Sequence, residues 1–188
     1  MPRNPVLRDH VAVAILEVAA RILAERRDAA SLAEIAEAAG VARSTLYRYF
    51  PNRDALLSAL AETAGLQIAA RVQEAELDVL PVPEALARLT RGLIATGGKY
   101  IALAYLRPKP TDSASQPADE QISGPLLGLF RRGAADGTFR ADIPAETLLA
   151  LYADLLEGTI KRAAGDRSAV EPASAALLTV FLNGALRR

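Results

Sequence analysis

Apolar residues recur at helical spacing along most of this chain. Val11, Ile15, Val18 and Ile22 stand three to four residues apart, the interval that places side chains on one face of an α-helix. Alanine, leucine, arginine and glutamate are abundant, and all four favour helix. The pattern predicts an all-α protein with helices near residues 8–26, 32–39, 42–50, 53–77, 84–106, 121–137, 144–164 and 169–186.

Two of the predicted helices are short and lie close together. Ser31 is a candidate N-cap for the first of them, and Glu34 completes a capping box. Gly40 ends that helix, because glycine tolerates the left-handed conformation found at helix ends. Val41 is then the apolar residue of the turn before the second short helix. Two short helices joined in this way indicate a helix-turn-helix, whose second helix enters the major groove of DNA.

The second short helix carries side chains that suit DNA. Its first turn holds an arginine, which can bond to a guanine edge, and two hydroxyl residues, which can bond to a base or a phosphate. Two tyrosines can place hydroxyls against the DNA backbone, and two further arginines add positive charge. With the cap residue included, the candidate DNA contacts are Ser31, Arg43, Ser44, Thr45, Tyr47, Arg48, Tyr49 and Arg53. Periodicity alone also allows an ordinary helical hairpin with a solvated basic face.

Composition excludes several other functions. The chain has 188 residues, 51% of them hydrophobic, which is enough for a sizeable core, and its formal net charge is zero. Zero net charge does not mark a nucleic-acid binder, but residues 40–53 contain three arginines and no acid. The absence of cysteine excludes disulfides and thiolate chemistry. With one histidine, no nucleophile elbow and no phosphate-binding glycine loop, we expect no enzyme, no metal and no cofactor.

Hydropathy also bears on location. No apolar run reaches the roughly 18 residues needed to cross a bilayer. The first five residues lack the apolar centre of a secretory signal. We therefore expect a cytoplasmic protein that does not contact a membrane.

Here the sequence resembles a known family. Residues 32–57 read LAEIAEAAGVARSTLYRYFPNRDALL, and this segment closely resembles the DNA-binding signature of the TetR family of repressors. The elements that match in order and spacing are Ile35-Ala36, Ala39-Gly40-Val41, Thr45-Leu46-Tyr47 and Tyr49-Phe50. The resemblance covers roughly residues 8–60. Two departures are Arg27-Asp28, where the family often has glycine, and Arg53, where lysine is commoner.

The resemblance implies roles for these residues and an organisation for the chain. By family position, Arg43, Ser44 and Thr45 meet bases, while Tyr47, Tyr49 and Arg53 meet phosphates. It implies a homodimer and a ligand pocket in a C-terminal helical domain. We expect a three-helix helix-turn-helix domain over residues 1–52 and a helical ligand-binding and dimerisation domain over residues 53–188, with the helix of residues 53–77 linking the two.

The expected function is a sequence-specific, DNA-binding transcriptional regulator. It would act as a repressor that a small molecule releases from a palindromic operator. One short helix makes too few contacts for specific binding, whereas two copies about 34 Å apart can read a palindrome. The wide apolar stripes of the last two helices would then pair in a dimer, although they could equally fill a monomer core. The alternative function is a helical protein-interaction module that does not bind DNA.

A ligand pocket would use aromatic and polar residues of the second domain. The candidates are Thr96, Tyr100, Tyr105, Phe130 and Tyr152, with Arg107 as a further polar group. Each of them also fits an ordinary core or surface position. The pair Gly97-Gly98 is expected to bend or split its helix, and a hinge or a close helix crossing are alternative roles for it.

Overall fold

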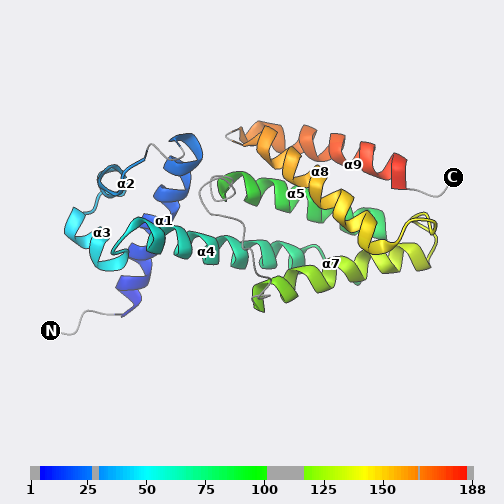
Figure 1. Ribbon diagram of the computed structural model, residues 1–188, viewed down its shortest axis with the longest axis horizontal. Coiled ribbons are helices and arrows are strands. Elements are labelled where there is room, and N and C mark those ends of the chain that lie inside the picture. The colour runs from blue at the N-terminus through cyan, green and yellow to red at the C-terminus, as the bar shows by residue number, and fades with distance from the viewer. Residues whose placement is uncertain (1–4, 27–29, 101–116, 165, 186–188) are drawn as a thin grey trace. The chain divides into compact units, whose positions relative to one another are not determined.

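The computed structural model describes residues 5–26, 30–100, 117–164 and 166–185 (Figure 1). These residues contain eight α-helices and one short 3-10 helix, which confirms the all-α class expected from periodicity. No described helix is both long and apolar enough to cross a bilayer. The chain forms two compact units, one drawn from residues 1–64 and 99–111 and the other from residues 65–98 and 112–188.

The N-terminal unit packs three helices against the start of a fourth. Its helices are α1 (Pro5–Arg26), α2 (Leu32–Ala38), α3 (Arg43–Tyr49) and the first part of α4 (Arg53–Glu74). Aliphatic side chains from all four meet in one core, together with several alanines that let the helices approach closely. Fully buried members are Ile15, Leu23, Ile35, Leu46 and Leu56. The apolar stripes of the sequence therefore face one shared interior.

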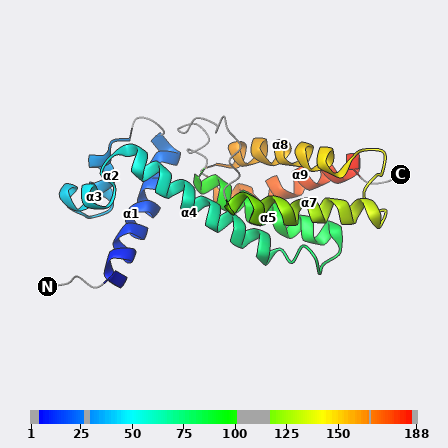
Figure 2. The same cartoon turned by 60° about the horizontal axis from the view of Figure 1, so that its bottom comes forward.

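The C-terminal unit is built from longer helices. They are the rest of α4, α5 (Val82–Tyr100), α7 (Pro117–Ala135), α8 (Ala145–Ala163), the 3-10 helix of Arg167–Ala169 and α9 (Val170–Ala185). Helix α8 packs against both α7 and α9, and it runs antiparallel to α9 (Figures 1 and 2). Helix α7 begins four residues earlier than the periodicity indicated.

Four aromatic rings fill the middle of this second unit. They belong to Phe130, Phe139, Tyr152 and Phe181, and neighbouring ring centroids lie 5.5–6.2 Å apart. All four side chains are buried. Tilted and edge-to-face pairs at these distances add to the stability from burial alone, so the rings join α7, α8 and α9 into one core.

The prediction that the pair Gly97-Gly98 splits its helix is wrong, because α5 continues through both glycines to Tyr100. Gly97 instead permits a close approach to α8. A Cβ at Gly97 would lie 2.6 Å from Cδ1 of Ile160 and 3.1 Å from its Cγ2. A Cβ at Gly98 would meet only the Cα of Ala164, at 3.9 Å. Of the alternatives raised by the sequence, the close helix crossing is the one observed, and it depends on Gly97.

The two glycines are therefore expected to respond differently to alanine. Gly98→Ala should stabilise the fold by up to about 1 kcal/mol, because alanine favours helix. Gly97→Ala should be less stable than Gly98→Ala by about 1–3 kcal/mol, because its methyl group overpacks the contact with Ile160. Urea unfolding measures both. Adding Ile160→Val to Gly97→Ala should reduce the difference in unfolding free energy between the two alanine variants. Equal stabilities of Gly97→Ala and Gly98→Ala would contradict the close crossing at Gly97.

Candidate nucleic-acid interface

The turn between α2 and α3 is a closed Schellman motif. Gly40 has φ +66°, in the left-handed region, where glycine is favoured over other residues. The Val41 amide donates to the Ala36 carbonyl at 3.0 Å, and the Gly40 amide donates to the Glu37 carbonyl at 3.0 Å. These two bonds satisfy carbonyls that the end of α2 would otherwise leave unpaired. The turn thus fixes the direction in which α3 leaves α2.

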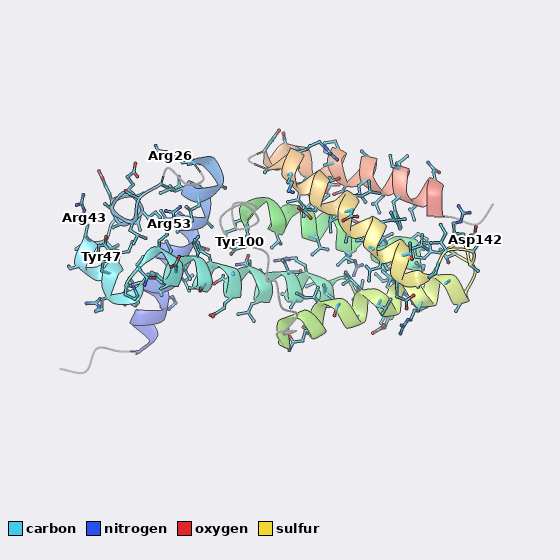
Figure 3. All side chains as sticks on the ribbon, viewed as in Figure 1. Arg26, Arg43, Tyr47, Arg53, Tyr100 and Asp142 are labelled. Atoms are coloured by element: carbon cyan, nitrogen blue, oxygen red, sulfur yellow. The ribbon has the colours of Figure 1, made fainter. Side chains whose placement is uncertain are left out.

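Helix α3 is held by one face and exposes the other. Leu46 is completely buried and Phe50, just beyond the helix, is nearly so. Arg43, Ser44 and Tyr47 are exposed on the outer face, and Figure 3 shows Arg43 and Tyr47 on the side of α3 away from α1. The structure therefore places Arg43 and Ser44, two of the three contacts predicted in the first turn, on the outward surface together with Tyr47.

Positive charge on this surface comes from Arg43 and Arg48. Within the described part of the chain, Arg43 makes no ion pair. Arg48 is exposed, and its guanidinium carbon lies 5.2 Å from the centre of the Tyr49 ring. A cation over an aromatic face at this distance is attracted by the ring quadrupole. Thr45 and Tyr49 are half-buried.

The start of α2 confirms the capping box. The Glu34 amide donates to Oγ of Ser31 at 3.2 Å, and the Ser31 amide donates to Oε2 of Glu34 at 2.8 Å. The Ser31 hydroxyl also donates to that carboxylate oxygen, at 2.8 Å. Arg26, the last residue of α1, lies 3.2 Å from Oε1 of Glu34. The bonds from Ser31, with the charge of Arg26 as a smaller contribution, lower the pKa of Glu34 below its ordinary value.

Arg53 points inward from the first position of α4 (Figure 3). Its Nη1 donates to the carbonyl oxygen of Ala30 at 2.6 Å, and the side chain is half-buried. Asn52 caps the same helix, because its Oδ1 accepts from the Ala55 amide at 2.8 Å. Arg53 therefore binds the backbone directly before α2.

The candidates for a ligand pocket belong to different units, and some lie outside the described residues. Thr96, Phe130 and Tyr152 are buried in the C-terminal unit. Tyr100, the last residue of α5, packs into the core of the N-terminal unit. Tyr105 and Arg107 lie outside the described residues.

One buried polar contact was missed by sequence reasoning. The hydroxyl groups of Thr90 and Tyr152 lie 2.9 Å apart, and Thr90 also donates to the Leu86 carbonyl at 2.6 Å. Burial raises the pKa of Tyr152 to about 12, so its hydroxyl stays protonated at neutral pH. A signal was present in the sequence, because Thr90 interrupts the buried apolar positions Leu86, Leu89 and Leu93.

Comparison with known sequences agrees with this geometry. The profile of the family described as bacterial regulatory proteins, tetR family, matches residues 15–60. The HTH-type transcriptional regulator NfxB of Pseudomonas aeruginosa is 31% identical over 161 residues, which cover 85% of this chain and 86% of that protein. The HTH-type transcriptional repressor LfrR of Mycolicibacterium smegmatis is 38% identical over 101 residues, covering 54% of this chain and 52% of LfrR.

Solved structures give the same relationship over nearly the whole chain. The TetR transcriptional regulator SCO0520 of Streptomyces coelicolor has a TM-score of 0.61 and 30% identity, covering 92% of this chain and 97% of its own. The TetR-like regulator LfrR of Mycobacterium smegmatis, in complex with proflavine, has a TM-score of 0.72 and 25% identity, covering 95% and 98%.

The lowered pKa of Glu34 makes the start of α2 sensitive to acid. A folded-state pKa below the unfolded value stabilises the fold above the unfolded pKa, and this stabilisation is lost as the pH falls through the folded pKa. Glu34→Gln should therefore be less stable than the unmodified chain at neutral pH, and the difference should shrink as the pH falls below the ordinary glutamate pKa of about 4.3. Urea unfolding across this range measures it. Glu37→Gln, exposed on the same helix, is the control, and a pH-independent loss for Glu34→Gln would refute the assignment.

Proposed function

Because the chain belongs to the TetR family of bacterial regulatory proteins and is a DNA-binding transcriptional regulator, we propose that it represses transcription as a homodimer on a palindromic operator. A small molecule that binds the C-terminal unit releases it. The observation that carries this proposal is the outward, polar first turn of α3 on a well-packed support.

The dimensions and chemistry of α3 support its entry into the major groove. Its seven residues rise about 1.5 Å each, so the helix is about 10 Å long, close to the groove width of about 12 Å. Arg43 on the outer face can donate two hydrogen bonds to O6 and N7 of guanine. Ser44 and Thr45 are next to it and can bond to a base or to a phosphate.

Phosphate contacts come from the flanks of the same surface. The hydroxyls of Tyr47 and Tyr49 and the guanidinium of Arg48 can bind the DNA backbone, which sets the register of the protein without reading sequence. The stacking of Arg48 on Tyr49 supports this role, because it reduces the freedom that both side chains would lose on binding. Ser31 is exposed at the start of α2 and is a further candidate for a phosphate contact.

An unpartnered apolar face supports the homodimer. Leu151 and Leu155 of α8 and Val180 of α9 are exposed large hydrophobic side chains, at 49%, 37% and 64%. They belong to two antiparallel helices that pack together, so one continuous surface can bury them against a second copy. A two-fold dimer also supplies the second recognition helix that a palindrome requires.

Release by an effector requires a ligand with different affinity for the DNA-binding and non-binding states. The solved complex of LfrR with proflavine supports small-molecule binding as the input. In this chain the C-terminal unit offers buried hydroxyl groups of Thr90, Thr96 and Tyr152 among apolar side chains. A pocket of apolar walls with a few polar groups is the usual form of a small-molecule site.

Selection of bound duplexes from a random pool tests the DNA-binding proposal. The purified protein should enrich a two-fold symmetric sequence. Arg43→Ala should cost about 1–3 kcal/mol on that sequence and relax preference at one base pair in each half-site. Arg48→Ala should weaken all duplexes alike and lower the salt slope by about one. Enrichment of no sequence would favour the interaction module, and unchanged preference in Arg43→Ala would remove its assignment to base edges.

A charge placed on the α8–α9 face tests the dimer. Val180→Glu should shift the protein to a monomer in sedimentation and lower operator affinity at least about tenfold, since a residue at the energetic centre of an interface contributes about 2 kcal/mol or more and tenfold corresponds to about 1.4 kcal/mol. Val79→Glu is the matched control, because Val79 is 78% exposed in the turn after α4. If Val180→Glu combined with Leu151→Glu leaves the dimer intact, the two copies associate through another surface.

A further inference from the structure

The peptide group that joins Ala30 to Ser31 has a charged partner on each side. Its carbonyl oxygen accepts from Nη1 of Arg53 at 2.6 Å. Its N–H donates to the carboxylate of Glu34 at 2.8 Å. Hydrogen bonds to ionised groups are stronger than neutral ones, and bonds in series polarise one another. This one peptide group therefore connects the first residue of α4 to the first turn of α2.

The network extends to α1 as well. Glu34 carries the second contact through its other oxygen, which lies 3.2 Å from Nη1 of Arg26 at the end of α1. Positive and negative groups thus alternate from Arg26 through Glu34 and the peptide group to Arg53. Ala30 itself is buried, so its carbonyl is held in the interior, where an unpaired oxygen would be costly.

We propose that Arg53 is a positioning residue that fixes the start of α2, and with it α3, by holding the carbonyl of Ala30, so that its main contribution to DNA recognition is orientation rather than phosphate charge. The proposal rests on the DNA-binding function proposed above. Because α2 and α3 are joined by the closed turn at Gly40, a shift at the start of α2 is passed to Arg43. Specific contacts depend on that orientation, whereas non-specific attraction to phosphate depends on charge alone.

Arg53→Met and Arg48→Met form a matched pair, since each removes one guanidinium. Affinity is measured on the duplex selected by the unmodified protein and on a shuffled duplex. For Arg53→Met, the ratio of the two affinities should fall about tenfold or more, the size expected for a hydrogen bond to a charged group. For Arg48→Met both affinities should fall by the same factor. Arg53→Lys, which keeps a charge and a donor, should recover part of the ratio.

Amide hydrogen exchange in the free protein gives a readout that needs no DNA. Exchange at Ser31 and Glu34 should rise at least about tenfold in Arg53→Met, relative to amides in the C-terminal unit, and should not change in Arg48→Met. Glu34→Ala should act through the same peptide group. The double variant Glu34→Ala/Arg53→Met should therefore show a smaller fold loss in the ratio of the two affinities than the product of the fold losses of the two single variants.

The outcomes separate the two proposals. If Arg53→Met matches Arg48→Met in both the affinity ratio and the exchange rates, Arg53 is only a source of charge and the positioning role is overturned. If the unmodified protein prefers no duplex, the proposed function fails. In that case the exchange rates at Ser31 and Glu34 still decide whether Arg53 holds the start of α2.

Discussion

A helix of seven residues has too few internal hydrogen bonds to be stable in water by itself. Helix α3 therefore depends on burial of Leu46 within it and Phe50 directly after it. The same two positions leave the opposite face to Arg43, Ser44 and Tyr47. Packing on one side is thus the condition under which polar side chains can be held outward on the other. The other helices of the N-terminal unit supply the core into which Leu46 and Phe50 pack.

Polar contacts around α2 and α4 fix the direction of the helix ends, which apolar packing specifies only weakly. Aliphatic contacts stabilise a helix against the core but specify its rotation and slide only weakly, because they are not directional. The Schellman turn at Gly40, the capping box at Ser31 and the bond from Arg53 to Ala30 are directional. Together they connect the ends of α2 to the helices before and after it. These directional end contacts therefore add to the core in setting how α3 is presented.

The C-terminal unit uses close packing for a different purpose. The crossing at Gly97 and Ile160 and the four tilted and edge-to-face rings give α5, α7, α8 and α9 a dense interior. In a densely packed core, a small displacement of one helix requires its neighbours to move, because close-packed side chains do not deform continuously. The outer face of α8 and α9 keeps apolar side chains exposed. One unit thus combines a densely packed interior with an outer face that keeps apolar side chains exposed.

Sequence alone determined the features whose causes lie within a few residues of one another. The helix-turn-helix, its cap at Ser31 and its turn at Gly40 follow from spacing of at most four or five positions, and the outward set around Arg43 follows from the same periodicity. Only tertiary structure decided which distant groups meet. Arg53 and Ala30 are 23 residues apart, and Thr90 and Tyr152 are 62 apart. Periodicity shows that a helix face is buried but does not show which partner covers it. Tertiary packing decided three such partners: the core that contains Tyr100, the helix that crosses at Gly97, and the carbonyl that Arg53 binds.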